Sequence, residues 1–334
     1  MLLFHKTTRQ ALEVALRPFR PSDAPHIIAC LRDAYGDTYV KPYLYTEEGI
    51  LHHEESGELC FSVAETPDGQ IVGITAYAQS GGLFPGMSEI ACQVVRREFN
   101  GYGLALPLAL HAMGRAERLP LAGQYARALG CHLISQKTLK GMGFTACGFL
   151  LNVFNKERFT YRYQNGSYAK IPQSLAVKRQ GAGHLGPVFL PEECAPLAEQ
   201  SFRSLGVTWE QAPGGALSGP DEWAWESDAV HDTLFLRART CGEAFPEHLA
   251  AALQAEAARK DGTVNLFLSL SRPGSAAAYE EARRLGFFPT GILPCTGDGT
   301  YLLLHHPLQV PVRLDGIPCI PEYEPFLDQI RRQL

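Results

Sequence analysis

The stretch VVRREFNGYGLA, residues 94–105, decides the fold, because an apolar, strand-like segment passes through a glycine turn directly into an apolar helix. The first amides of a helix have no partners within it and lie at the positive end of its dipole. Glycines at this point let an anion approach the backbone. The junction is therefore predicted to hold a phosphate or pyrophosphate without the help of a lysine.

The flanking sequence predicts short strands and helices on both sides of this junction. LRPFRPSDA (16–24) is typical of a strand that ends at a proline before a helix N-cap. The turn PDG (67–69) joins the strand-like segments 60–65 and 71–78 as an antiparallel hairpin. SQKTLKGMGF (135–144) predicts a short helix that ends at Gly143 before a strand.

Together these features resemble the Gcn5-related N-acetyltransferase (GNAT) superfamily over about residues 13–155. The spacing Asn100-x-x-Gly103-x-Ala105 is similar to the acyl-CoA loop of that family, with Asn where Gln or Arg is usual. The resemblance implies an α/β fold of the α+β kind, in which a mixed, mostly antiparallel sheet is flanked by helices. It also implies acetyl-CoA as the cofactor.

The resemblance further implies which residues bind the cofactor. The strand 87–95 would open at a bulge, so that the backbones of Val94 and Val95 pair with the pantetheine arm. The pyrophosphate would lie on the turn formed by Asn100, Gly101, Tyr102, Gly103, Leu104 and Ala105. Pro107 lies early enough in the following helix to be accommodated, yet it is expected to kink that helix or to stop its first turn.

Composition and charge narrow the function classes. With 334 residues the chain is long enough for two domains, and a net charge of −5 with scattered Lys and Arg argues against a nucleic-acid partner. The apolar runs are too short for a membrane span, and the N-terminus lacks a signal-peptide core, so a cytoplasmic location is expected. Nine cysteines without a Cys-x-x-Cys pair predict reduced thiols and no metal site.

An internal echo divides the chain. Gly143-Phe144-x-x-x-Gly148 recurs as Gly286-Phe287-x-x-x-Gly291, each time after a helix-like segment. The sequence thus predicts an acetyltransferase domain at 1–180 and a degenerate copy at 181–334. In the copy, TCGEAF (240–245) offers one glycine and a carboxylate where a pyrophosphate would need bare amides, so loss of CoA binding is expected. An unrelated α/β domain with the same helix-Gly-Phe-strand connection is the alternative.

Acyl transfer to an amine needs a base and an acid. Glu89 is the candidate base, directly or through water, with a pKa raised by burial beside the thioester; a strand Glu that faces solvent or pairs with Arg is the alternative. The family's usual acid, a tyrosine, corresponds to Leu139. His132, Ser135, Tyr125 or water would then protonate the thiolate, although His132 also fits a plain core histidine.

The segment YGDTYVKPYLY (35–45) is the candidate acceptor site. Tyr35 and Tyr39 would stack on a small-molecule amine, and Asp37 would supply one charge. The alternative is a connecting loop whose tyrosines pack on the sheet. The chain is expected to act as a monomer or homodimer.

The expected function is an acetyl-CoA-dependent N-acyltransferase that works by direct attack in a ternary complex, with the second half closing one wall of the acceptor cleft. The absence of a tyrosine at Leu139 keeps open a non-catalytic acyl-CoA-binding sensor or assembly module. A dinucleotide oxidoreductase is disfavoured, because Gly101-x-Gly103 lacks the third glycine and the acidic ribose partner of that motif.

Overall fold

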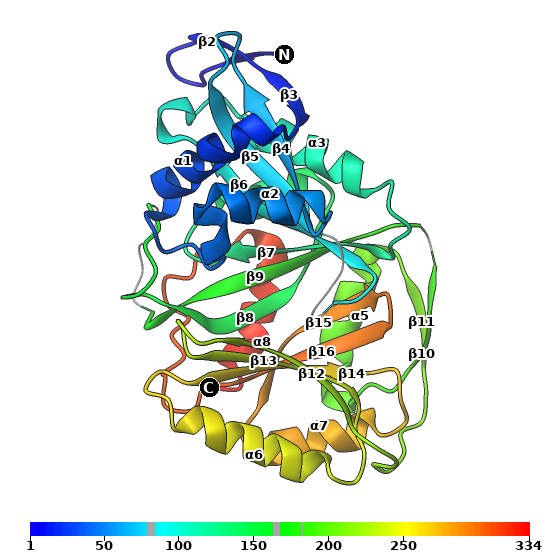
Figure 1. Cartoon of the computed structure of the whole chain (residues 1–334). Helices are drawn as coiled ribbons and strands as arrows, with labels where there is room; N and C mark the ends of the chain where they lie inside the picture. The colour runs from blue at the N-terminus through cyan, green and yellow to red at the C-terminus, as the bar shows by residue number, and fades with distance from the viewer. Residues whose placement is uncertain (79–83, 163–167, 182) are drawn as a thin grey trace.

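One long sheet runs through the molecule (Figure 1). The computed structural model describes residues 1–78, 84–162, 168–181 and 183–334. Within these residues, twelve strands follow the order β12-β13-β14-β16-β15-β8-β9-β7-β6-β5-β4-β3. The helices α1, α2 and α3 surround the upper end of this sheet in Figure 1, and α6 and α7 lie at its lower end.

The elements of the first half, residues 1–180, are the strands β1 (Leu2–Phe4), β2 (Ala11–Glu13), β3 (Ala15–Pro18), β4 (Leu59–Glu65), β5 (Ile71–Ala78), β6 (Met87–Val95), β7 (Gly123–Leu129), β8 (Thr145–Asn155) and β9 (Lys170–Arg179), and the helices α1 (Ala24–Tyr35), α2 (Glu47–Glu55), α3 (Ala105–Ala116) and α4 (Ile134–Gly141). Strands β6 and β7 are parallel, and the other pairs in this half are antiparallel. The predicted mixed, mostly antiparallel sheet flanked by helices is confirmed.

The elements of the second half, residues 181–334, are the strands β10 (His184–Val188), β11 (Thr208–Gln211), β12 (Glu222–Asp228), β13 (Thr233–Thr240), β14 (Thr263–Ser269), β15 (Phe288–Thr296) and β16 (Gly299–His306), and the helices α5 (Ala195–Leu205), α6 (Phe245–Ala257), α7 (Ser275–Arg284) and α8 (Glu324–Arg331). From β12 onward, the order and strand directions repeat those from β5 to β9. This repetition supports the proposal of a degenerate copy.

The two halves meet where β8 pairs with β15, at Gly148 and Gly291. These are the last glycines of the two echoed motifs. A Cβ atom on Gly148 would lie 2.4 Å from the Cα of Gly291, and one on Gly291 would lie 2.3 Å from the carbonyl oxygen of Cys147. The junction therefore leaves room for glycine alone on both strands.

Buried polar contacts also join the halves. The Lys170 ammonium on β9 reaches the hydroxyls of Thr233 (2.7 Å) and Thr263 (2.9 Å) and the carbonyls of Asp232 (3.1 Å) and Asp261 (3.0 Å). Burial lowers the pKa of Lys170 to about 8, against the opposing effect of the neighbouring carboxylates. The ammonium thus fixes the starts of β13 and β14 against the first half.

Gly148→Val is expected to lower the free energy of unfolding by about 3 kcal/mol or more. The new side chain would collide with the backbone of the neighbouring strand, and valine does not readily adopt the φ of +134° that Gly148 has. Gly114→Ala, in α3 with open space around the new Cβ, is the control and should be neutral or stabilising. Denaturant unfolding of both variants measures the difference. Equal midpoints would show that the glycine contact does not hold the halves together.

Candidate functional site

The site begins where two parallel strands separate. Strand β6 pairs with β7 only over Met87–Glu89 and Gly123–Tyr125, after which the two strands diverge. The corresponding parallel strands of the second half, β13 and β14, stay paired through six residues to Ala238 and Leu268. The gap is therefore a feature of the first half.

A bulge bends β6 away from β7, as the family resemblance implies. The pairing of β6 with β5 shifts by one residue opposite Ile74–Ala76, and Cys92 has a φ of +53°. Since the Arg96 amide donates to the Val72 carbonyl (2.9 Å), the backbone groups of Val95 point into the gap and those of Val94 point to β5. Of the two predicted valines, only Val95 offers its backbone to the gap.

The glycine turn lies between the end of β6 and the start of α3. Within the described part of the chain, the amides of Gly101, Tyr102, Gly103 and Leu104 donate no hydrogen bond. Gly103 has a φ of +75° with open space beside it. The amides that precede this twelve-residue helix are thus available to an anion.

The edges of this turn are fixed by its neighbours. The amide of Asn100 donates to the Arg97 carbonyl (3.1 Å), and the Gly101 carbonyl accepts from the Lys6 amide (3.0 Å). α3 begins at Ala105 and continues past Pro107 to Ala116, so the helix accommodates this proline and the expected stop in the first turn is wrong. The reason is that Pro107 is in the first turn, where the amide has no partner inside the helix.

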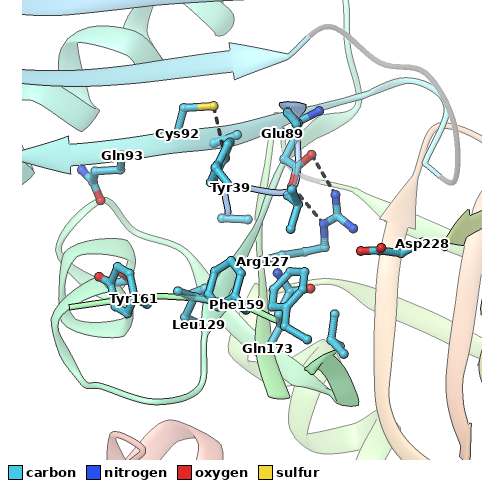
Figure 2. Close-up of a pocket in the computed structure, with 18 of the residues that line it drawn as sticks. Tyr39, Glu89, Cys92, Gln93, Arg127, Leu129, Phe159, Tyr161, Gln173 and Asp228 are labelled. Atoms are coloured by element: carbon cyan, nitrogen blue, oxygen red, sulfur yellow. Dashed lines mark hydrogen bonds and ion pairs between the residues drawn. The ribbon is translucent and has the colours of Figure 1, made fainter. Parts of the chain in front are cut away.

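A cavity of about 300 Å³ occupies the gap (Figure 2). Five residues predicted from the sequence line it: Tyr35, Tyr39, Glu89, His132 and Ser135. Asp37 does not, because its side chain is 76% exposed and pairs with Arg32 (2.9 Å); its predicted substrate contact is corrected. Glu226, Asp228 and Phe235 close one side, so the second half does contribute a wall.

Glu89 is held by an ion pair. The Arg127 side chain donates to both of its oxygens (2.9 and 3.2 Å), and the Tyr125 hydroxyl lies at 3.4 Å. Burial alone would raise the pKa of Glu89, but Arg127 and then Lys41 hold the pKa below its ordinary value. The expected raised pKa is therefore wrong, and a carboxylate in this state is a weak base.

The register shows what replaces this pair in the second half. When Gly148 is aligned with Gly291, the strand pairings align Arg127 with Phe267 and Glu89 with Phe235. Two buried aromatic rings thus stand where the first half has an ion pair. Charged side chains thus lie where β6 and β7 separate, and apolar side chains lie at the corresponding positions of β13 and β14, which remain paired.

His132 is the neutral imidazole of a hydrogen-bonded chain. Burial, and then the nearby Arg162 charge, lowers its pKa to about 4. Its Nδ1 accepts from the Ile134 amide (3.1 Å), so Nε2 carries the proton and donates to the Tyr161 hydroxyl oxygen (3.0 Å). Tyr161 follows β8 and stacks on the His132 ring, and it was not predicted from the sequence.

Arg162 crosses the open end of the gap. It donates to the Val95 carbonyl (2.6 Å) and to the Asp33 carboxylate on α1 (2.6 Å). The backbone acceptor predicted for the pantetheine arm is therefore already bound by the protein. A ligand strand along β6 has to displace this side chain.

In the second half, the carboxylate of Asp221 occupies the corresponding turn between β13 and α6. The Gly242 amide donates to one oxygen of Asp221, and His248 contacts the other, both at 2.5 Å. The Asp221 side chain is 4% exposed, and a Cβ atom on Gly242 would lie 1.8 Å from the Gly219 carbonyl oxygen. Asp221, rather than the predicted Glu243, therefore takes the place of an anion here.

Within the described residues, no group of three or more His, Cys, Asp or Glu side chains could hold a metal ion. None of the helices in that same part of the chain is both long and apolar enough to cross a membrane.

No protein-family model and no curated protein matches the chain. Among solved structures, it is similar to an N-acetyltransferase from Staphylococcus aureus Mu50 (17% identity, 50% of this chain and 98% of that one, TM-score 0.40) and to a GNAT superfamily phosphinothricin acetyltransferase from Sinorhizobium meliloti (18%, 50% and 89%, TM-score 0.41). A putative acetyltransferase from Salmonella typhimurium gives 13%, 51% and 96%, with a TM-score of 0.41. Half of this chain is thus similar to N-acetyltransferases of the GNAT family.

Proposed function

We propose that the first half transfers an acyl group from acyl-CoA, with acetyl-CoA as the expected donor, to an amine in the cavity between β6 and β7. One observation carries this proposal: the strands diverge beside a helix start whose preceding amides have no partner in the described chain. An extended pantetheine arm would add to β6 as a strand does to a sheet edge, and the pyrophosphate would take the amides of the glycine turn.

The reaction forms a C–N bond and breaks a C–S bond. The amine nitrogen attacks the thioester carbonyl, the thiolate leaves and takes a proton from a donor in the cavity, and the nitrogen gives up its proton to water. We assign the proton donated to sulfur to the Tyr161 hydroxyl. His132 supports this role, because its Nε2–H already points at the Tyr161 oxygen and stabilises the phenolate that remains.

Glu89 has a different role in this scheme from the predicted one. Its ion pair with Arg127 positions a guanidinium at the point of divergence, and Lys41 adds a second positive charge nearby. Positive charge beside the acceptor amine favours the neutral, nucleophilic form. Ser135 lines the same cavity from α4 and supplies a second hydroxyl there.

A non-catalytic acyl-CoA-binding module is the second candidate. One observation favours it: Leu139 lines the cavity where the family's tyrosine would stand. Binding of acetyl-CoA without turnover of any amine would select this function.

Gly103→Val is expected to abolish CoA binding, because a branched side chain would cover the unpartnered amides of the turn. Gly181→Val is a matched control, since Gly181 has a similar φ (+83°, against +75°) and open surroundings, but lies far along the chain from the turn. Calorimetry measures the affinity, and circular dichroism checks the fold. Wild-type affinity in a folded Gly103→Val protein would overturn the cofactor site.

Tyr161→Phe is expected to lower kcat by about 10²-fold with little change in CoA affinity, because a proton donor is lost. Adding Leu139→Tyr should restore part of the rate, since Leu139 lines the same cavity. Because the pKa of His132 is about 4, its titration should not appear in the pH–rate profile above about pH 5. An unchanged kcat in Tyr161→Phe would remove Tyr161 from the mechanism.

A further inference from the structure

The hairpin of β1 and β2, at the upper end of the molecule in Figure 1, contacts the glycine turn. Its paired leucines, Leu3 and Leu12, pack against a buried apolar cluster formed in part by the end of β6 and the start of α3. The Lys6 amide, in the loop that joins the two strands, donates to the Gly101 carbonyl (3.0 Å). This loop, residues 5–10, is therefore fixed beside the turn.

One side chain of the loop touches the turn directly. A Cβ atom on Gly101 would lie 2.3 Å from Nε2 of His5, and the His5 ring meets the Tyr102 ring edge to face, with 5.1 Å between their centroids. Nδ1 of His5 accepts from the amides of Thr7 (3.3 Å) and Thr8 (3.0 Å), so Nε2 carries the proton. That N–H has no acceptor within the described residues. It lies beside the four amides of the turn, which are themselves unpartnered in the same part of the chain.

The loop also brings positive charge to the turn. Its sequence, HKTTRQ, contains Lys6 and Arg9 and no carboxylate, in a chain whose net charge is −5. The one carboxylate of the segment 96–104, Glu98, is paired with Arg96 (2.9 Å). Hydrogen-bond donors without acceptors, together with an excess of positive charge, suit an anion that has several oxygens.

We propose that the hairpin loop completes the phosphate site, and that the Nε2–H of His5 donates to the pyrophosphate held by the amides of the turn. This inference rests on the proposed acyl-CoA site. The loop lies outside residues 13–155, so the family resemblance gives it no role in binding. A phosphate oxygen accepts from an amide and from an imidazole N–H alike, and its charge makes each hydrogen bond stronger than one between neutral groups. Lys6 and Arg9 attract the same anion over a longer range.

The pyrophosphate and the separate 3′-phosphate of CoA can be told apart by their absence from smaller probes. His5 contacts Gly101, whose amide is one of the four in the turn, so its N–H is assigned to the pyrophosphate. Dephospho-CoA keeps the pyrophosphate and lacks the 3′-phosphate, and pantetheine lacks both. Calorimetry on the full chain therefore compares CoA, dephospho-CoA and pantetheine.

Two substitutions remove the Nε2 donor and preserve different parts of the loop. His5→Asn keeps a side-chain oxygen that can accept from the Thr7 or Thr8 amide, and His5→Phe keeps a ring that packs on Tyr102. Each is expected to weaken the binding of CoA and of dephospho-CoA about tenfold and that of pantetheine not at all, because a hydrogen bond to a charged group is lost. His26, exposed on α1, gives the matched control His26→Asn, which should change none of the three affinities. Circular dichroism checks the fold.

Wild-type CoA affinity in either folded His5 variant would overturn the assigned role of His5. A loss that is seen with CoA and absent with dephospho-CoA would overturn the assignment to the pyrophosphate. An equal loss with pantetheine would show that His5 only supports the structure, which also rejects the proposal. Failure of the proposed function gives a different result, because the wild-type chain would then bind neither CoA nor acetyl-CoA.

Discussion

The divergence of β6 from β7 after Glu89 is the constraint on which the rest of the site depends. A bulge at Cys92 bends one strand, and the Glu89–Arg127 ion pair joins the two strands at the point where they separate. In the second half, Phe235 and Phe267 take the corresponding positions and the ladder stays closed. Burying an ion pair among apolar side chains costs free energy of desolvation, and polar surroundings lower that cost. The cavity therefore stabilises the ion pair, and the ion pair in turn keeps apolar side chains from closing the cavity.

The two halves contribute different parts of the proposed transferase site. The first half has the gap and the open helix start, and the second half has neither, because Asp221 fills its turn and its parallel strands remain paired. The halves are joined at Gly148 and Gly291 and through Lys170, so the wall formed by β12 stands in a fixed position beside the gap. In our proposal the first half performs the chemistry, and this wall closes one side of the cavity.

Local patterns in the sequence predicted the local features of the structure. The glycine turn and the α3 start follow from residues 94–105, because the residues that form them are adjacent in the sequence. The bulge lies earlier, at Cys92, and was implied by the family resemblance of the strand 87–95. The echoed glycines predicted a repeat, but not that Gly148 would pack on Gly291, since strand pairing between halves has no local signal.

The wrong or missing predictions also concern contacts between residues that are far apart in the sequence. The pKa of Glu89 was expected to rise because Arg127, 38 residues later, could not be assigned as its partner from the sequence. An arginine inside the apolar strand QYARAL (124–129) was the available signal. Tyr161 and Arg162 reach the site from the segment after β8, and only the tertiary fold brings them to His132 and Val95.

The central claim is that one acyl-CoA binds in the gap of the first half, and a CoA titration of the full chain followed by a crystal structure of the complex tests it most directly. The account predicts one CoA per chain, its pyrophosphate on the amides of residues 101–104, and Arg162 displaced from the Val95 carbonyl. Two CoA molecules per chain, one bound at Gly242 of the second half, or no binding at saturating CoA would contradict it.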